Sequence, residues 1–205
     1  GVERDADAER TDVGAGAEPM IFFRTAVRRS ALHDEGLFAD EPIPQASIVG
    51  IFGLHAKLTT EAEYQRQQLG ANYEHVQTGV RWIGDYFMYD TDILPEDFIN
   101  HASAPNLIYH CGIAIAGRDI AKDEELSIDY RFILARDDVN AFTDPETGET
   151  ISGFAPEEAF RRSAMAVLDL LAGRGFADDK RRVSAALAAY RAHYPLPEPC
   201  PVPEP

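Results

Sequence analysis

The chain has 205 residues, 45% of them hydrophobic, and its formal net charge at pH 7 is −16. This length and apolar content suffice for one domain with a buried core plus an appendage. The acidity excludes a general nucleic-acid-binding role, because neutralising phosphate groups needs a basic surface. It allows a basic partner, such as a lysine-rich protein segment, although acidity can also serve only to keep a protein soluble.

The N-terminal segment 1–19 is acidic, rich in alanine and glycine, and almost free of large apolar residues. Such a segment buries too little surface to offset the entropy of ordering it, so we expect a flexible tail. Residues 20–136 carry short apolar runs separated by turn residues, which is typical of a mainly β domain with a few helical additions. The runs expected to form strands are IFF, AV, GLFA, SIVGIF, RWIGDYFMYD, GIAIAGRDI and ELSIDYRF.

Two helices are expected inside this β-rich segment. Thr59 or Thr60 is a suitable N-cap for a helix within residues 57–76. The run LPEDFINHA, residues 94–102, predicts a short helix that carries an Asn-His pair near its end.

The C-terminal part changes character. Residues 137–154 have the composition of a loop. Residues 155–194 contain two amphipathic patterns, which predict a helical hairpin that completes the domain. The proline-rich segment 195–205 is expected to be an extended tail. The apolar faces of the hairpin would also suit a homodimer.

Cysteine spacing and hydropathy indicate whether the protein has a metal site, disulfides or a membrane-spanning segment. The two cysteines, Cys111 and Cys200, form no CxxC pair, which argues against a structural zinc site and against a disulfide framework. No apolar run is long enough to span a bilayer, and the N-terminus lacks a signal-peptide pattern. We therefore expect no metal, no membrane partner and a cytoplasmic location.

Three motifs follow one another in the β-rich segment: RRSALHDEGLFADEPIP, DFINHASAPNLIY and DEELSIDYRF. Together they resemble the SET-domain family of S-adenosylmethionine-dependent protein lysine methyltransferases. In the second motif, Asn100-His101 is followed by Pro105-Asn106, and the third reads Glu-Leu-x-x-Asp-Tyr from Glu125 to Tyr130. The resemblance implies a SET-domain fold of several short β-sheets with a knot-like crossing.

The resemblance also implies S-adenosylmethionine as the cofactor and a lysine-containing protein or peptide as the substrate. Asn100 would hold the amino-acid end of the cofactor, and His101 would bind its adenine largely through the backbone, with the ring fixing the crossing. The alternative is that both residues only cap a turn. First-motif residues whose backbone would face the cofactor are His33, Glu35, Gly36 and Leu37.

Methyl transfer from a sulfonium needs a neutral amine, whereas a free lysine has a pKa near ~10.4. Desolvation and the positive cofactor lower that pKa, so alignment and exclusion of water are the main tasks. Tyr130 matches the family's catalytic tyrosine, which orients the amine. Tyr109 stands where some members have a tyrosine that limits methylation, and it predicts mainly monomethylation. The alternative is plain packing at a strand edge. The implied walls of the lysine channel are Tyr86, Ile128 and Phe132.

Several departures from the family pattern keep a second function open. Asp34 replaces the first glycine of a Gly-x-Gly, Ala102 replaces a serine, and Glu96-Asp97 stands where an arginine often precedes the second motif. A catalytically inactive SET-fold module that binds proteins is therefore the alternative to an enzyme. A third reading, a β-rich hydrolase, lacks any sequence signature of a nucleophile–base pair.

Overall fold

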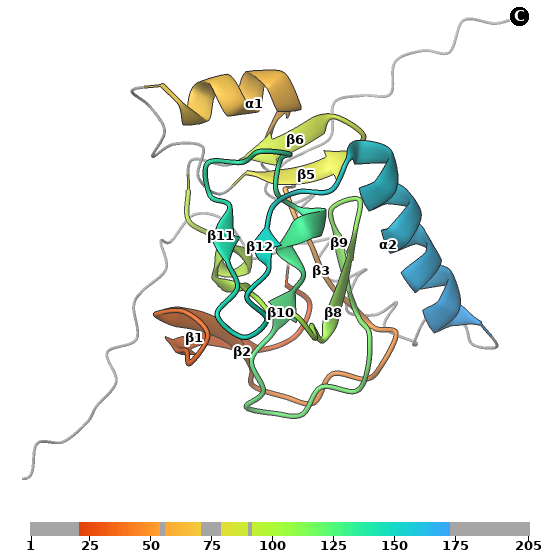
Figure 1. Ribbon diagram of the computed structural model, residues 1–205. Helices are drawn as coiled ribbons and strands as arrows, with labels where there is room; N and C mark the ends of the chain where they lie inside the picture. The colour runs from red at the N-terminus through yellow and green to blue at the C-terminus, as the bar shows by residue number, and fades with distance from the viewer. Residues whose placement is uncertain (1–20, 54–55, 71–78, 90–91, 173–205) are drawn as a thin grey trace, which may run out of the picture.

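The chain that the structure describes contains short strands grouped in five small sheets and joined by turns and loops (Figure 1). The structure is a computed structural model and describes residues 21–53, 56–70, 79–89 and 92–172. Two α-helices and two short 3₁₀ turns complete these described parts. The prediction of a mainly β fold with α additions is therefore confirmed.

The first motif lies on an antiparallel hairpin. Strands β1 (Thr25–Arg29) and β2 (Glu35–Ala39) pair along their whole length. The prediction of a strand at GLFA is confirmed, and Leu37 from it is buried in the core. The run expected to be a strand at IFF instead makes a single isolated bridge between Ile21 and Gly50.

A three-stranded sheet with the order β3-β9-β8 contributes buried residues to the main core. Its strands are β3 (Ile48–Ile51), β8 (Leu107–His110) and β9 (Ile113–Ala116). The hairpin between β8 and β9 turns at Cys111 and Gly112, which both have positive φ, 49° and 81°. Positive φ at both central residues is the geometry of a tight turn that matches the twist of the strands.

A second three-stranded sheet has the order β4-β6-β5 and carries the first helix. Its strands are β4 (Lys57–Thr60), β5 (Val80–Ile83) and β6 (Tyr86–Tyr89), and helix α1 (Glu61–Gln68) follows β4 directly. The predicted cap is confirmed, because the Thr60 side chain accepts a backbone N–H of the first turn. The helix lies within the predicted range, and residues 57–60 before it pair with β6 as strand β4.

The second and third motifs meet in a two-stranded parallel pair. These are strand β7 (Asn100–His101), which follows the 3₁₀ turn η2 (Pro95–Phe98), and strand β10 (Ser127–Ile128). Strand β10 is followed by the 3₁₀ turn η3 (Tyr130–Phe132). The Asn-His pair is thus a strand residue pair and not the end of a helix. Tyr130 lies in a turn just after a strand that is shorter than predicted. The parallel pairing places segments about 27 residues apart in direct contact.

The segment 137–154, expected to be a loop, contains a short hairpin of β11 (Phe142–Thr143) and β12 (Thr150–Ile151). Helix α2 (Pro156–Leu171) follows and packs against β8 and η3, with Ala159 as one of its buried residues. The second helix of the predicted hairpin lies outside the described residues. None of the helices in the described ranges combines the length and the apolar character that crossing a membrane requires.

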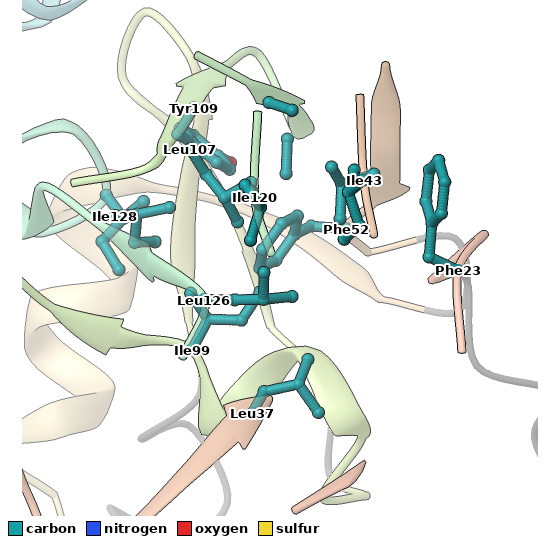
Figure 2. Close-up of a cluster of buried hydrophobic side chains, with 14 of the residues drawn as sticks. Phe23, Leu37, Ile43, Phe52, Ile99, Leu107, Tyr109, Ile120, Leu126 and Ile128 are labelled. Atoms are coloured by element: carbon teal, nitrogen blue, oxygen red, sulfur yellow. The ribbon is translucent and has the colours of Figure 1, made fainter. Parts of the chain in front are cut away.

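The main core includes residues of all three motifs (Figure 2). Ile99 precedes Asn100, and Leu126 and Ile128 belong to the third motif; all three side chains are at most 2% exposed. Because these neighbours are buried, the backbone at the motifs is held in one place. The other labelled core residues in Figure 2 are Phe23, Leu37, Ile43, Phe52, Leu107, Tyr109 and Ile120.

Candidate functional site

A cavity of about 800 Å³ opens beside the parallel pair β7–β10. Residues from all three motifs line it, together with the hairpin that holds β11 and β12. The cavity is thus the place where segments distant in sequence converge. The residues predicted from the sequence that line it are His33, Asn100, His101, Ile128 and Tyr130.

The Asn100 side chain is held by hydrogen bonds within the chain. Its Nδ2 donates to the Glu35 carbonyl oxygen and to Glu125 Oε1, both at 2.8 Å. An amide nitrogen carries two hydrogens, so both are used. Its Oδ1 accepts no hydrogen bond from the residues that the structure describes. Asn100 therefore offers an acceptor, and not a donor, to a ligand in the cavity.

His101 connects the strand pair to Tyr130. Its Nδ1 accepts the Tyr130 backbone N–H at 3.1 Å, so this nitrogen carries no proton. Burial lowers the pKa of His101 below its usual value, against the opposing charges of Asp129 and Asp144. The imidazole is thus neutral near pH 7. Its ring lies edge-on to Tyr130, with 5.6 Å between the centroids.

Tyr130 lines the same cavity, and its hydroxyl group is fixed. The hydroxyl donates to the Ile99 carbonyl oxygen at 2.9 Å. Burial, together with the negative charges of Asp97 and Glu125, raises the pKa of Tyr130 to about 12. The phenol is therefore neutral at physiological pH, and its oxygen keeps lone pairs that can accept a hydrogen bond from a substrate.

The first motif contributes in three different ways. His33 lines the cavity from an exposed loop. Glu35 contributes its carbonyl oxygen to Asn100, and Gly36 lies against both Asn100 and Glu125. Leu37 is 1% exposed, belongs to the core and does not line the cavity. Asp34 is exposed and is not a lining residue, so this departure from the family pattern leaves the cavity open.

The remaining predicted channel residues lie apart from the cavity. The Tyr109 hydroxyl donates to the Arg81 carbonyl oxygen at 2.5 Å, and burial raises its pKa. Tyr109 and Phe132 line a separate pocket of about 20 Å³ beside α2. The Tyr109 ring nevertheless packs edge-on against Phe52, which lines the large cavity. Tyr86 is 47% exposed on β6. Channel roles for these residues stay predictions.

Carboxylates dominate the charge at the cavity. Among the described lining residues, no lysine or arginine occurs. The acidic lining residues are Glu96, Asp97, Asp144 and Glu146. Asp144 and Glu146 come from the segment expected to be a plain loop, and sequence reasoning assigned them no role. A negative cleft with low-dielectric walls attracts cationic ligands.

Comparisons with known proteins give a family match and similar solved structures. The SET-domain family matches residues 34–131 of the chain. Among solved structures, the chain is similar to the Neurospora SET domain protein DIM-5, a histone lysine methyltransferase, at 19% identity and a TM-score of 0.42, over 52% of this chain and 51% of that one. It is also similar to the methyltransferase domain of the human histone-lysine N-methyltransferase SETMAR, at 24% identity and a TM-score of 0.41.

The SETMAR match covers 53% of this chain and 45% of the solved one. The chain thus spans about half the length of the solved chains that it matches. The search of curated proteins gives no significant match.

Proposed function

We propose that the chain transfers a methyl group from S-adenosylmethionine to a lysine side-chain amine of a protein or peptide, and the match of the SET-domain family to residues 34–131 supports this proposal. The observation that carries the proposal is the convergence of Asn100, His101 and Tyr130 on one cavity. These residues come from two motifs that the parallel pair β7–β10 brings side by side.

The lining of the cavity fits this cofactor. S-adenosylmethionine carries an ammonium group and a sulfonium, and it supplies an electrophilic methyl group on the sulfonium. Asn100 Oδ1 is an acceptor suited to the ammonium. The acidic lining residues favour the positive charges of the cofactor and of an approaching lysine. The net charge of −16 fits a basic substrate segment as well.

The chain's own residues would then align the amine and exclude water. The neutral Tyr130 hydroxyl accepts a hydrogen bond from the lysine amine while it stays bonded to the Ile99 carbonyl oxygen. Ile128 and other apolar lining residues desolvate the amine, which lowers its pKa and exposes the lone pair for attack. The lysine nitrogen would attack the methyl carbon that the cofactor supplies, so that the nitrogen–carbon bond would form as the sulfur–carbon bond breaks, and the product would lose a proton to solvent.

Calorimetric titration with S-adenosylmethionine tests the cofactor part of the proposal. We expect the native chain to bind the cofactor. Asn100→Ala should bind it at least about 10-fold more weakly, because a hydrogen bond to a charged group is lost. Gln67→Ala is the control, since it removes an amide on α1 that is remote from the cavity. A native chain that does not bind the cofactor would instead support the inactive SET-fold module.

Tyr109 is proposed to limit the reaction mainly to monomethylation. Its hydroxyl is buried and held by the Arg81 carbonyl oxygen, and its ring packs against Phe52 of the cavity wall. Tyr109→Phe removes this oxygen, so we expect the main product to shift to dimethyl-lysine or trimethyl-lysine. Mass spectrometry of a lysine peptide that the native chain methylates measures the shift. Tyr89→Phe is the control. A Tyr109→Phe variant that still forms only monomethyl-lysine would contradict the proposed role of Tyr109.

A further inference from the structure

We infer that Glu125, held by Ser30, is a positioning residue that fixes the Asn100 amide with its oxygen toward the cavity and so makes the site selective for an ammonium-bearing cofactor. The inference rests on the proposed function, because it names the part of S-adenosylmethionine that Asn100 reads. The SET-domain match specifies neither the role of Glu125 nor the orientation of the Asn100 amide, nor the preference for an ammonium group that follows from it.

Two acceptors on one side decide how the amide points. Asn100 Nδ2 lies 2.8 Å from Glu125 Oε1 and 2.8 Å from the Glu35 carbonyl oxygen. In the flipped amide, Oδ1 would face these two oxygens and repel both. Oδ1 must therefore point away from Glu125 and Glu35, on a side chain that lines the cavity.

Ser30 keeps the Glu125 carboxylate in place. Its Oγ lies 2.7 and 2.8 Å from the two carboxylate oxygens and donates its single hydrogen to them. The same Oγ accepts the backbone N–H groups of Leu32 at 2.8 Å and of His33 at 3.3 Å. One carboxylate thus orients both the Asn100 amide and the exposed loop that lines the cavity.

Gly36 is required for this arrangement because it lets the carboxylate approach the β2 backbone. A Cβ at this position would lie 2.2 Å from Glu125 Oε1 and 3.0 Å from Asn100 Nδ2. The carboxylate and the amide would both have to shift. The glycine of the first motif, the asparagine of the second and the glutamate of the third therefore act as one unit.

The selectivity follows from the fixed direction. An ammonium group can donate to Asn100 Oδ1, whereas a ligand without the amine leaves this acceptor without a donor. We expect the native chain to bind S-adenosylmethionine about 10-fold more tightly than its analogue with hydrogen in place of the α-amino group. In Glu125→Ala the amide is free to turn, so the preference should fall to about twofold while affinity for the deaminated analogue changes little.

Calorimetric titration of both ligands into the native chain, Glu125→Ala, Glu125→Gln and the exposed control Glu157→Ala tests the inference. A glutamine keeps one acceptor for Asn100 but no charge, so Glu125→Gln should retain most of the preference. Equal loss of the preference in Glu125→Gln and Glu125→Ala would mean that charge alone acts, and it would overturn positioning. Equal weakening of both ligands would show a merely structural role and would also overturn it.

Two further outcomes separate this inference from the proposed function. Binding of S-adenosylmethionine with an unchanged preference in Glu125→Ala overturns the inference and leaves the function standing. Absence of binding to the native chain overturns both. If Glu125→Ala does not fold, as judged by circular dichroism, Ser30→Ala replaces it. That variant frees the carboxylate and should reduce the preference about threefold, and an unchanged preference would count against positioning.

Discussion

Replacing Tyr130 with phenylalanine should lower the rate of methyl transfer about 100-fold, because misplacement of a reacting amine by about 1 Å costs this much. The hydroxyl is held 2.9 Å from the Ile99 carbonyl oxygen, so its position in the cavity is defined. Without it, the amine has no fixed acceptor at this wall. Single-turnover transfer of a labelled methyl group to a lysine peptide measures the effect.

The Tyr130→Phe variant also separates alignment from base catalysis. Because the pKa of Tyr130 is raised to about 12, the phenol stays protonated across the physiological range and cannot act as a phenolate base there. The rate of the proposed methyl transfer by the native chain should thus show no inflection from Tyr130 between pH 7 and about pH 10. Binding of S-adenosylmethionine should change little, and Tyr89→Phe serves as the control. A variant with nearly native transfer would assign alignment of the amine to another group.

The sequence motifs predicted residues that line the cavity where these residues are close along the chain. Asn100 and His101 are adjacent, and Tyr130 follows buried Leu126 and Ile128 at the spacing of a strand entering a turn. Residues that are this close along the chain stay close in the folded structure, so their pattern can be recognised from the sequence. The two strands that carry them are only two residues long, so no periodicity reveals their parallel pairing.

The acidic wall of the cavity was not predictable in the same way. Asp144 and Glu146 lie in a polar segment with turn residues, and their composition fits a solvated loop. Their place depends on the pairing of β11 with β12, which brings the turn between these strands to the cavity. The contact between Ser30 and Glu125 likewise cannot be predicted from a local sequence pattern, because 95 residues separate them.

Tyr109 shows that the alternation of a strand does not fix the role of a side chain. Alternation along β8 buries Leu107 and Tyr109. The direction of the hydroxyl, however, depends on which backbone oxygen lies opposite, and that oxygen belongs to Arg81 on β5. A charged strand residue is ordinarily expected to face solvent, yet Arg81 is 3% exposed.

Arg81 joins three separate parts of the chain, which explains its burial. The guanidinium donates to both carboxylate oxygens of Glu61 at the start of α1, at 3.0 and 3.2 Å. It also donates to the carbonyl oxygens of Gly84 and Leu134, at 2.8 and 3.2 Å, and it lies 4.9 Å from the centroid of the Phe87 ring. These contacts tie the sheet that carries α1 to the segment that follows Tyr130.

Replacing Arg81 with methionine should lower the free energy of unfolding by about 3–5 kcal/mol, because the shielded Glu61 carboxylate loses its counter-charge. Urea unfolding at pH 7 measures the change. Arg66→Met on α1 is the matched control, since its pair with Glu63 is exposed and is worth at most about 1 kcal/mol. Adding Glu61→Gln to Arg81→Met should recover part of the loss by removing the unpaired charge. A loss no larger than that of Arg66→Met would mean that the hydrogen bonds and the ion pair of Arg81 add little to the free energy of unfolding. Backbone pairing alone would then hold these segments together.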